Sequence, residues 1–248
     1  MSRLNPDDYC KACWKKVEEY VKGLDSGDVI AGKYIHKIRE KYRRLLSQKD
    51  KYVYKVDQVD KVFKFFSLLN IEHKNSFVQI DLFPWQCFVL SYIFGFYLTD
   101  NPEKRLIREV LLFIARKAGK TAFAASIQLY GLLADGVLNA QSMLLANTAG
   151  QASVALNFAK AIVTHSPLLS LSSSPSSSSR HSKLTVDGVT VVYSSSRYHG
   201  PRTPCPVNAL LAHTYQAVCP SATSKAGSVA WIICPAVKTT STASPASP

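Results

Sequence analysis

Residues 111–121 (LLFIARKAGKT) join an apolar run to a short basic turn that ends in Gly119, Lys120 and Thr121. The apolar residues 110–114 predict a strand buried on both faces, and the residues after Thr121 are good helix formers. A turn between such a strand and helix can wrap its backbone N–H groups around phosphates. The segment therefore predicts a P-loop that binds a nucleotide.

The residues of the predicted loop have separate chemical roles. Lys120 would reach the β- and γ-phosphates, and the Thr121 hydroxyl would hold Mg²⁺. The match to G-x-x-x-x-G-K-[ST] is incomplete, because Ile114 stands in the place of the first glycine. A chance basic turn between a strand and a helix is the alternative interpretation. The predicted nucleotide-binding residues of the loop are Ala115, Arg116, Lys117, Ala118, Gly119, Lys120 and Thr121.

A second strand and helix follow the first pair along the chain. Gly136 is expected at the C-cap of the P-loop helix, and residues 142–146 predict a neighbouring strand. A further helix is expected through Val154, Leu156 and Val163. Two such units favour an α/β fold, with a P-loop NTPase-like parallel sheet flanked by helices and the ligand at the carboxyl ends of the strands.

The N-terminal residues predict a basic helical region. Apolar stripes at helical spacing occur in residues 6–46, around a turn at 23–28, and again in 57–69. The net charge of +13 suits a phosphate-rich partner such as double-stranded DNA. A solvated helix face interleaved with acidic residues explains the pattern equally well. The basic residues concerned are Lys11, Lys15, Lys16, Lys22, Lys33, Lys37, Arg39, Lys41, Arg43, Arg44, Lys49, Lys51, Lys55, Lys61 and Lys64.

The cysteines and the apolar segments favour neither a metal site nor a membrane segment. Cys10 and Cys13 have C-x-x-C spacing, but no second pair stands at zinc-site distance. Two thiols on one helix face are therefore the preferred interpretation, with zinc as the alternative. No apolar run of about 18 residues occurs, and the N-terminus lacks a signal-type core, so we expect no membrane segment and a cytoplasmic location.

Five short elements accompany the predicted loop and its flanks: Phe83-Pro84-Trp85-Gln86, Ile93-Phe94-Gly95-Phe96, Ala115-Arg116-Lys117-Ala118-Gly119-Lys120-Thr121, Ala134-Asp135-Gly136 and Ala146-Asn147-Thr148-Ala149-Gly150-Gln151-Ala152. Together they resemble the ATPase part of the large terminase subunit of tailed bacteriophages and prophages. In that family a P-W-Q element precedes a P-loop of the form R-K-x-G-K-[ST], which lacks the first glycine. The resemblance extends from about residue 29 to about residue 169.

The resemblance implies roles for two residues. Gln86 would recognise adenine, because a side-chain amide both donates and accepts hydrogen bonds. An ordinary polar residue at a helix start is the alternative. Arg116 would be the catalytic residue, stabilising charge on the γ-phosphate during hydrolysis. The alternative is a surface arginine that only attracts nucleotide.

The resemblance also implies cofactors and partners. The intact family hydrolyses ATP, with Mg²⁺, to move double-stranded DNA into procapsids in the cytoplasm of the bacterial host. A terminase small subunit, a portal protein and a homo-oligomeric ring would be its partners and assembly. Two rival classes stay open: a helicase-like P-loop ATPase, and a basic nucleic-acid-binding module without ATPase activity.

The composition changes sharply after about residue 169. Sixteen of the 17 acidic residues lie in positions 1–135, and only Asp187 lies beyond them. The chain has no Asp-Glu pair to bind Mg²⁺ and activate water, and no carboxylate cluster for a nuclease. Residues 184–192 predict a hairpin that turns at Asp187 and Gly188.

Two hypotheses explain this change. The preferred one is a truncated or shifted reading frame near residues 169–179, and the other is a Ser-rich linker followed by a small β-rich unit that includes residues 189–193 and 229–234. The expected parts are a basic helical region (1–75), a partial P-loop ATPase domain (76–169) and a Ser/Thr/Pro-rich tail that folds poorly (170–248). We expect weak ATP binding and little or no hydrolysis.

Overall fold

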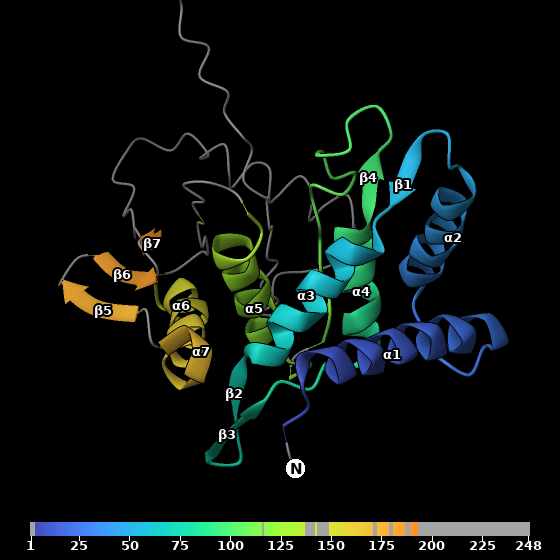
Figure 1. The fold of residues 1–248 in the computed structure, drawn as a ribbon. Helices are drawn as coiled ribbons and strands as arrows, with labels where there is room; N and C mark the ends of the chain where they lie inside the picture. The colour runs from blue at the N-terminus through green and yellow to red at the C-terminus, as the bar shows by residue number, and fades with distance from the viewer. Residues whose placement is uncertain are drawn as a thin grey trace, which may run out of the picture.

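The structure is a computed structural model that describes residues 3–115, 117–136, 142, 149–170, 173–178, 181–186 and 189–192 (Figure 1). The helices are α1 (Pro6–Ser26), α2 (Lys33–Ser47), α3 (Val56–Leu68), α4 (Pro84–Gly95), α5 (Lys120–Leu133), α6 (Ala149–His165) and α7 (Pro167–Ser170). The strands are β1 (Tyr52–Tyr54), β2 (Asn70–His73), β3 (Ser76–Gln79), β4 (Phe96–Leu98), β5 (Ser173–Ser178), β6 (His181–Val186) and β7 (Val189–Val192).

Helix α1 begins and ends at residues suited to those places. Asn5 Oδ1 accepts a hydrogen bond from Asp8 N (2.8 Å), and Pro6 occupies the first turn. Gly27 leaves the helix with φ 85°, a conformation that glycine adopts without strain. Helix α1 continues through most of the predicted turn at 23–28 and ends at Ser26, and α2 begins at Lys33. The predicted apolar stripe of α1 is buried against α3 and α4 at Tyr9, Cys13 and Val17.

Helices α3 and α4 form the centre of the core. The predicted α3 stripe is fully buried. Helix α4 ends at Gly95, where the chain continues as β4 and pairs antiparallel with β1. A Cβ at Gly95 would lie 2.7 Å from Cζ of the Tyr54 ring, so only glycine lets this ring pack on the helix. The buried α3 residues are Val59, Val62, Phe63, Phe66 and the following Leu69.

The hairpin of β2 and β3 fastens α6 to the N-terminal helices. The Phe77 ring stacks on the His165 ring with centroids 3.5 Å apart. Asn70 donates from its backbone N–H to Ser166 Oγ (2.9 Å) and from Nδ2 to the His165 carbonyl (2.9 Å). Helix α6 also packs against α5 and spans the segment for which the sequence predicts a helix.

Residues 110–115 differ from the predicted strand with two buried faces. They belong to none of the three antiparallel sheets that the described residues form. Their burial alternates: Leu112 packs against the core, whereas Leu111 is 39% exposed and Phe113 is 51% exposed. Two buried faces need a neighbouring layer on each side, and most of the predicted partner strand, 143–146, lies outside the described residues. The described ranges therefore contain no parallel sheet.

The segment after α7 forms a three-stranded antiparallel sheet in the order β5-β6-β7. Val186 pairs with Val189, which confirms the predicted hairpin, although Asp187 and Gly188 lie outside the described residues. The serine run forms strand β5, so the linker interpretation is wrong for residues 173–178. Backbone hydrogen bonds make this ladder, and serine supplies them as any non-proline residue does. Residues 229–234 lie outside the described part.

Helix α5 ends differently from the prediction. Ala134 is its C-cap, and Gly136 takes the left-handed conformation (φ 75°) two residues later. Asp135, between them, forms an ion pair with Arg105. The backbone N–H of Ala134 donates a hydrogen bond to the Tyr130 carbonyl, and this hydrogen bond allows a non-glycine residue at the C-cap.

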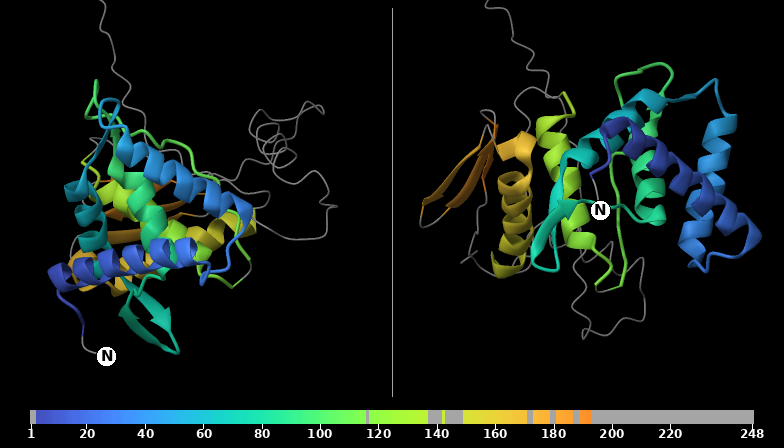
Figure 2. Two further views of the ribbon diagram at one scale, coloured as in Figure 1. Left: turned by 90° about the vertical axis from the view of Figure 1, so that its right-hand side faces the viewer. Right: turned by 60° about the horizontal axis from the view of Figure 1, so that its bottom comes forward.

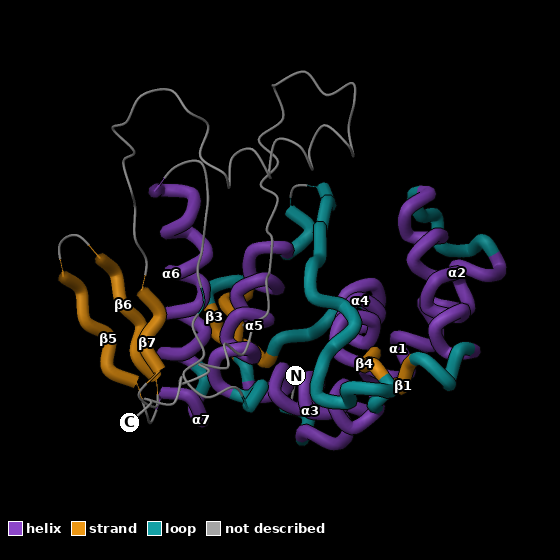
Figure 3. The backbone as a smooth tube through the Cα atoms, turned by 90° about the horizontal axis from the view of Figure 1, so that it is seen from above, coloured by secondary structure: helices purple, strands orange, loops and turns teal. Residues whose placement is uncertain are grey.

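The two ends of the molecule are occupied by different elements. Helix α2 lies at one end and the β5–β7 sheet at the other, with α1, α3, α4 and α5 between them (Figure 1, the right view of Figure 2, and Figure 3). No helix among the described residues is long and apolar enough to span a membrane.

The N-terminal cysteines are packed in the core rather than gathered around a metal. Cys10 Sγ donates to Asp60 Oδ1 (3.3 Å), and burial raises the pKa of the Cys10 thiol to about 12. Cys13 lies against Cys87 of α4, and the hydrogen bond between their thiols and burial both raise the Cys13 pKa. The described residues hold no cluster of three or more His, Cys, Asp or Glu side chains suited to a metal.

Candidate nucleotide site

The loop before α5 has a backbone suited to an anion. Lys117 and Gly119 both take left-handed conformations, with φ 65° and 71°. Gly119 is the N-cap of α5, and no side chain caps that helix. The first N–H groups of a helix have no intrahelical partners, and its dipole gives this end partial positive charge. The start of α5 therefore presents donors to a negatively charged group.

Lys120 lies within the loop that it was predicted to serve. Its Nζ donates to the carbonyl of Ile114 (3.1 Å), so the ammonium group spans the loop from its last residue to its first. A carbonyl is a neutral acceptor, and an arriving phosphate would offer a stronger, charge-assisted partner. The structure thus brings the Lys120 ammonium group to the backbone of the loop.

Gln86 lies beside the same glycine. It is only 5% exposed, and its Oε1 accepts a hydrogen bond from the backbone N–H of Phe83 (2.9 Å). The amide nitrogen, Nε2, lies 3.8 Å from the position of a Cβ built on Gly119. Gln86 therefore both caps its own helix and directs an amide group toward the loop before α5. The two interpretations of this residue are compatible.

Phe83 is a site residue that the sequence argument missed. Its ring is next to the loop, with Cε2 4.0 Å from the Cβ position at Gly119, and 55% of the residue is exposed. Phe83 is the N-cap of α4, so the N-termini of α4 and α5 meet at this point. Its position before Pro84 gave a signal, because an aromatic residue beside a predicted adenine-reading glutamine is a possible stacking partner.

Packing between aromatic side chains fixes the two helices to each other. Trp85 of α4 packs edge-on against Phe123 of α5, with centroids 5.5 Å apart. Farther along, Tyr130 of α5 packs against Phe94 (5.0 Å) and Phe65 (5.5 Å). These contacts orient the first turn of α5 against α3 and α4.

The remaining predicted residues have different places. Thr121 is partly buried in the first turn of α5, and Ala118 is partly buried beside it. Ala115 and Lys117 are exposed on the loop. Arg116, the predicted catalytic residue, lies outside the described residues.

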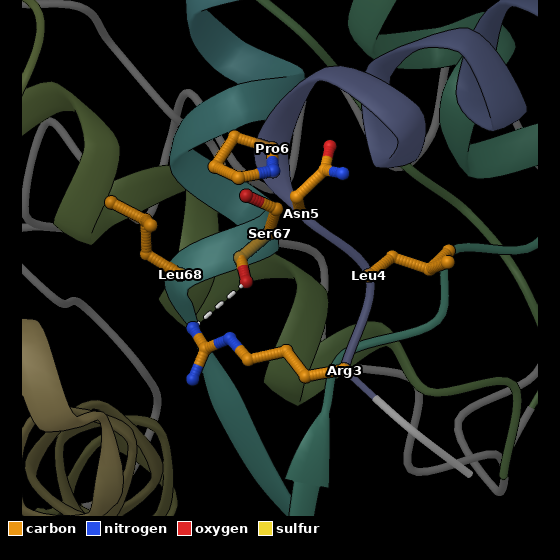
Figure 4. Close-up of a pocket in the computed structure, with 6 residues that line it drawn as sticks. All are labelled: Arg3, Leu4, Asn5, Pro6, Ser67 and Leu68. Carbon is orange, nitrogen blue, oxygen red and sulfur yellow. Dashed lines mark hydrogen bonds between the residues drawn. The ribbon is translucent and has the colours of Figure 1, made fainter.

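A separate pocket lies away from this loop. It has a volume of about 280 Å³ and lies where the N-terminal segment meets the end of α3 (Figure 4). Arg3 Nη2 donates a hydrogen bond to the Ser67 carbonyl there (3.0 Å). A cation at this place is favourable because the C-terminal end of a helix carries partial negative charge. No P-loop residue lines it, so we attribute it to docking of the N-terminus. Its lining residues are Arg3, Leu4, Asn5, Pro6, Ser67 and Leu68.

Comparison with known proteins gives one family and one solved structure. The family model described as "Terminase large subunit, ATPase domain" matches residues 84–198. The match starts at α4 and includes Gln86 and the loop, and it continues past residue 169, where the resemblance was expected to end. The change in composition near residues 169–179 thus lies inside the match.

The solved structure is titled "Crystal structure of the HK97 bacteriophage large terminase". It is 26% identical to this chain with a TM-score of 0.45, and the match covers 59% of this chain. The chain spans only 28% of that terminase. No curated protein matches the chain significantly.

Proposed function

We propose that this chain is the ATP-binding part of a motor that packages double-stranded DNA into procapsids, because residues 84–198 match the family model of terminase large subunit ATPase domains. The proposed partners are those of the intact family: double-stranded DNA, a terminase small subunit and a portal protein. The proposed setting is a homo-oligomeric ring in the cytoplasm of the bacterial host. We also propose that residues 110–114 and 142–146 form neighbouring strands of a parallel sheet.

The meeting of two helix N-termini at Gly119 is the observation that carries the proposal. Both N-termini add partial positive charge, and the uncapped first turn of α5 adds N–H donors. The Lys120 ammonium already lies against the loop backbone. A triphosphate at this point would receive all three kinds of stabilisation.

The base would lie on the α4 side of the loop. The exposed Phe83 ring offers a flat apolar surface, and the Gln86 amide beside it offers an N–H donor to a ring nitrogen of adenine. The Gln86 carbonyl oxygen already accepts from Phe83 N, but it keeps a second lone pair for the exocyclic amine of adenine. Phe83 and Gln86 would therefore bind the base together.

The phosphate end of the site would involve Thr121 and Arg116. The Thr121 hydroxyl fits Mg²⁺, which takes few protein ligands and completes its octahedron with phosphates and water. Bound Mg²⁺ would neutralise phosphate charge. We propose Arg116 as the residue that steadies the γ-phosphate. With no Asp-Glu pair in the sequence, we expect ATP to bind and to turn over far more slowly than in a competent packaging ATPase.

A fluorescent ATP analogue titrated in the presence of Mg²⁺ tests the phosphate contacts. Lys120→Ala should weaken binding by roughly 10- to 150-fold, because a hydrogen bond to a charged group contributes about 1.5–3 kcal/mol. Lys104→Ala, which removes an exposed lysine elsewhere, is the matched control and should bind as the wild type does. Equal affinity in Lys120→Ala and the wild type would refute the site.

Gln86→Glu tests recognition of the base. The variant keeps an oxygen to accept from Phe83 N and replaces the amide donor with a carboxylate oxygen. The new negative charge would weaken the binding of ATP and of inorganic tripolyphosphate alike, whereas loss of the donor would weaken only the binding of ATP. We expect the loss for ATP to exceed the loss for tripolyphosphate, and equal losses would show that Gln86 does not contact the base.

A further inference from the structure

Helix α2 carries a stripe of basic side chains on its exposed face. Lys33, Lys37, Lys41 and Arg44 follow one another at intervals of four, four and three residues, which places them on one side of an α-helix. All four are exposed. We call these four residues the α2 stripe, and at 1.5 Å per residue it is roughly 16 Å long.

No member of the α2 stripe has an acidic partner among the described residues, and Lys33 Nζ lies 5.3 Å from the centre of the Tyr34 ring. On α2 itself, Arg39 and Arg43 form ion pairs with Asp25 of α1. On α1, Lys11 and Lys15 lie within ion-pair distance of Asp8 and Glu19. Within residues 3–115, none of the ion pairs involves a member of the stripe. Its one acidic neighbour on α2 is the exposed Glu40.

The opposite face of α2 is already used for packing. Tyr42 and Leu45 are buried, and the Tyr42 ring contacts those of Phe88 (5.4 Å) and Phe96 (5.4 Å). A basic amphipathic helix that binds lipid needs a free apolar face. The packed face of α2 thus favours a polyanion that contacts only the charged side. The helix lies at the end of the molecule opposite the β5–β7 sheet (right view of Figure 2).

We propose that the α2 stripe is a contact surface for the phosphate backbone of double-stranded DNA. The proposal deepens the proposed function, because it names the surface on which this chain would meet the DNA. One DNA strand rises 3.4 Å per phosphate, so a stripe of roughly 16 Å faces about five phosphates of that strand. Four cations therefore match a continuous run of phosphates. Such contacts position DNA without reading its sequence.

The test measures binding of the full chain to a labelled DNA duplex of random sequence, without nucleotide, over a series of salt concentrations. Each phosphate contact contributes about −0.9 to the slope of log K against log salt. The variant K33Q/K37Q/K41Q/R44Q should therefore have a slope smaller in magnitude by about 3 to 4. Four phosphate contacts make the affinity fall roughly 150-fold between 50 and 200 mM salt. The variant should lose this part of the salt dependence.

Two further variants make the result specific. K11Q/K15Q/K22Q/K61Q removes the same net charge from α1 and α3 and should change the slope by less than about 1. K33R/K37R/K41R keeps the charge and should bind as the wild type does. Equal effects of the two quadruple variants, no DNA binding by the wild type, or binding to phosphatidylglycerol vesicles in place of DNA would each overturn the proposal.

The outcome is separable from the test of the nucleotide site. Lys120→Ala should keep full DNA affinity, because α2 contributes nothing to the loop. The α2 variant should likewise bind the fluorescent ATP analogue normally. A stripe variant with unchanged DNA binding would refute this inference and leave the ATP site standing, and loss of ATP binding alone would do the reverse.

Discussion

Replacing Phe83 with alanine tests the part of the site that sequence analysis missed. An aromatic side chain has roughly 200 Å² of surface to bury, and Phe83 is 55% exposed, so about 110 Å² is free. A base stacked on one face would cover about half of that area. At about 25 cal/mol per Å², covering 55 Å² contributes roughly 1.4 kcal/mol, which is a factor of ten in affinity.

The assay is the same titration with the fluorescent ATP analogue, supported by competition with unlabelled ATP. We expect Phe83→Ala to lower the affinity for ATP about tenfold, which is within the range known for base stacking on aromatic residues. Phe83→Tyr keeps the ring and should retain wild-type affinity. Tripolyphosphate, which has no base, should compete equally well with both variants.

Two results would refute the stacking role. One is unchanged ATP affinity in Phe83→Ala. The other is an equal loss for ATP and tripolyphosphate, which would mean that the substitution had disturbed the loop rather than the base contact. Thermal unfolding of each variant separates these effects from loss of the fold, and since Phe83 is largely exposed its removal should lower the melting temperature little.

Four other predictions concern the scaffold. Gly95→Ala should destabilise the fold by about 1–3 kcal/mol, because the new Cβ would overlap the Tyr54 ring, and calorimetry should find its melting temperature below that of the wild type. Gly131→Ala, in the middle of α5 with open space around it, should raise stability by up to about 1 kcal/mol, and a decrease would contradict the geometry. Cys10, Cys13 and Cys87 should resist alkylation at pH 8 until denaturant is added, read by peptide mass spectrometry, since all three are buried. Stability should fall as the pH rises from about 9 toward 12, measured by urea unfolding. The pKa of the Cys10 thiol and that of the Tyr130 phenol are each raised by burial to about 12, so over this range the folded chain binds more protons than the unfolded chain.

Helices with a regular apolar stripe could be predicted from the sequence. The stripes of α1 and α3 decide which faces are buried, and their spacing alone is sufficient to find them. The start of α5 was equally accessible, since Gly119 and Lys120 mark it. Contacts between distant segments were not accessible. The pairing of β1 with β4 depends on Gly95 admitting the Tyr54 ring, which no local pattern encodes.

The prediction for residues 110–114 failed for a related reason. An apolar run shows which side chains a segment could bury. Which of them are buried depends on the elements that pack against the segment. Leu112 meets the core, but Leu111 and Phe113 remain exposed among the described residues. The sequence places Phe83 near Gln86, but its proposed role also depends on the approach of two helix N-termini that are 36 residues apart in the sequence, at Phe83 and Gly119.

Nucleotide binding and hydrolysis are separable in this architecture. Helix α5 is oriented by Trp85, Phe94 and Phe65 of the N-terminal helices, so its first turn and Lys120 are positioned by packing that precedes the P-loop in the chain. The base side of the proposed site lies on α4, which is part of the same packed unit. Activation of water requires a carboxylate opposite the γ-phosphate, and neither α4 nor α5 carries an acidic residue. We therefore expect a chain with these helices to bind ATP, and we expect the acid that activates water to come from outside α4 and α5.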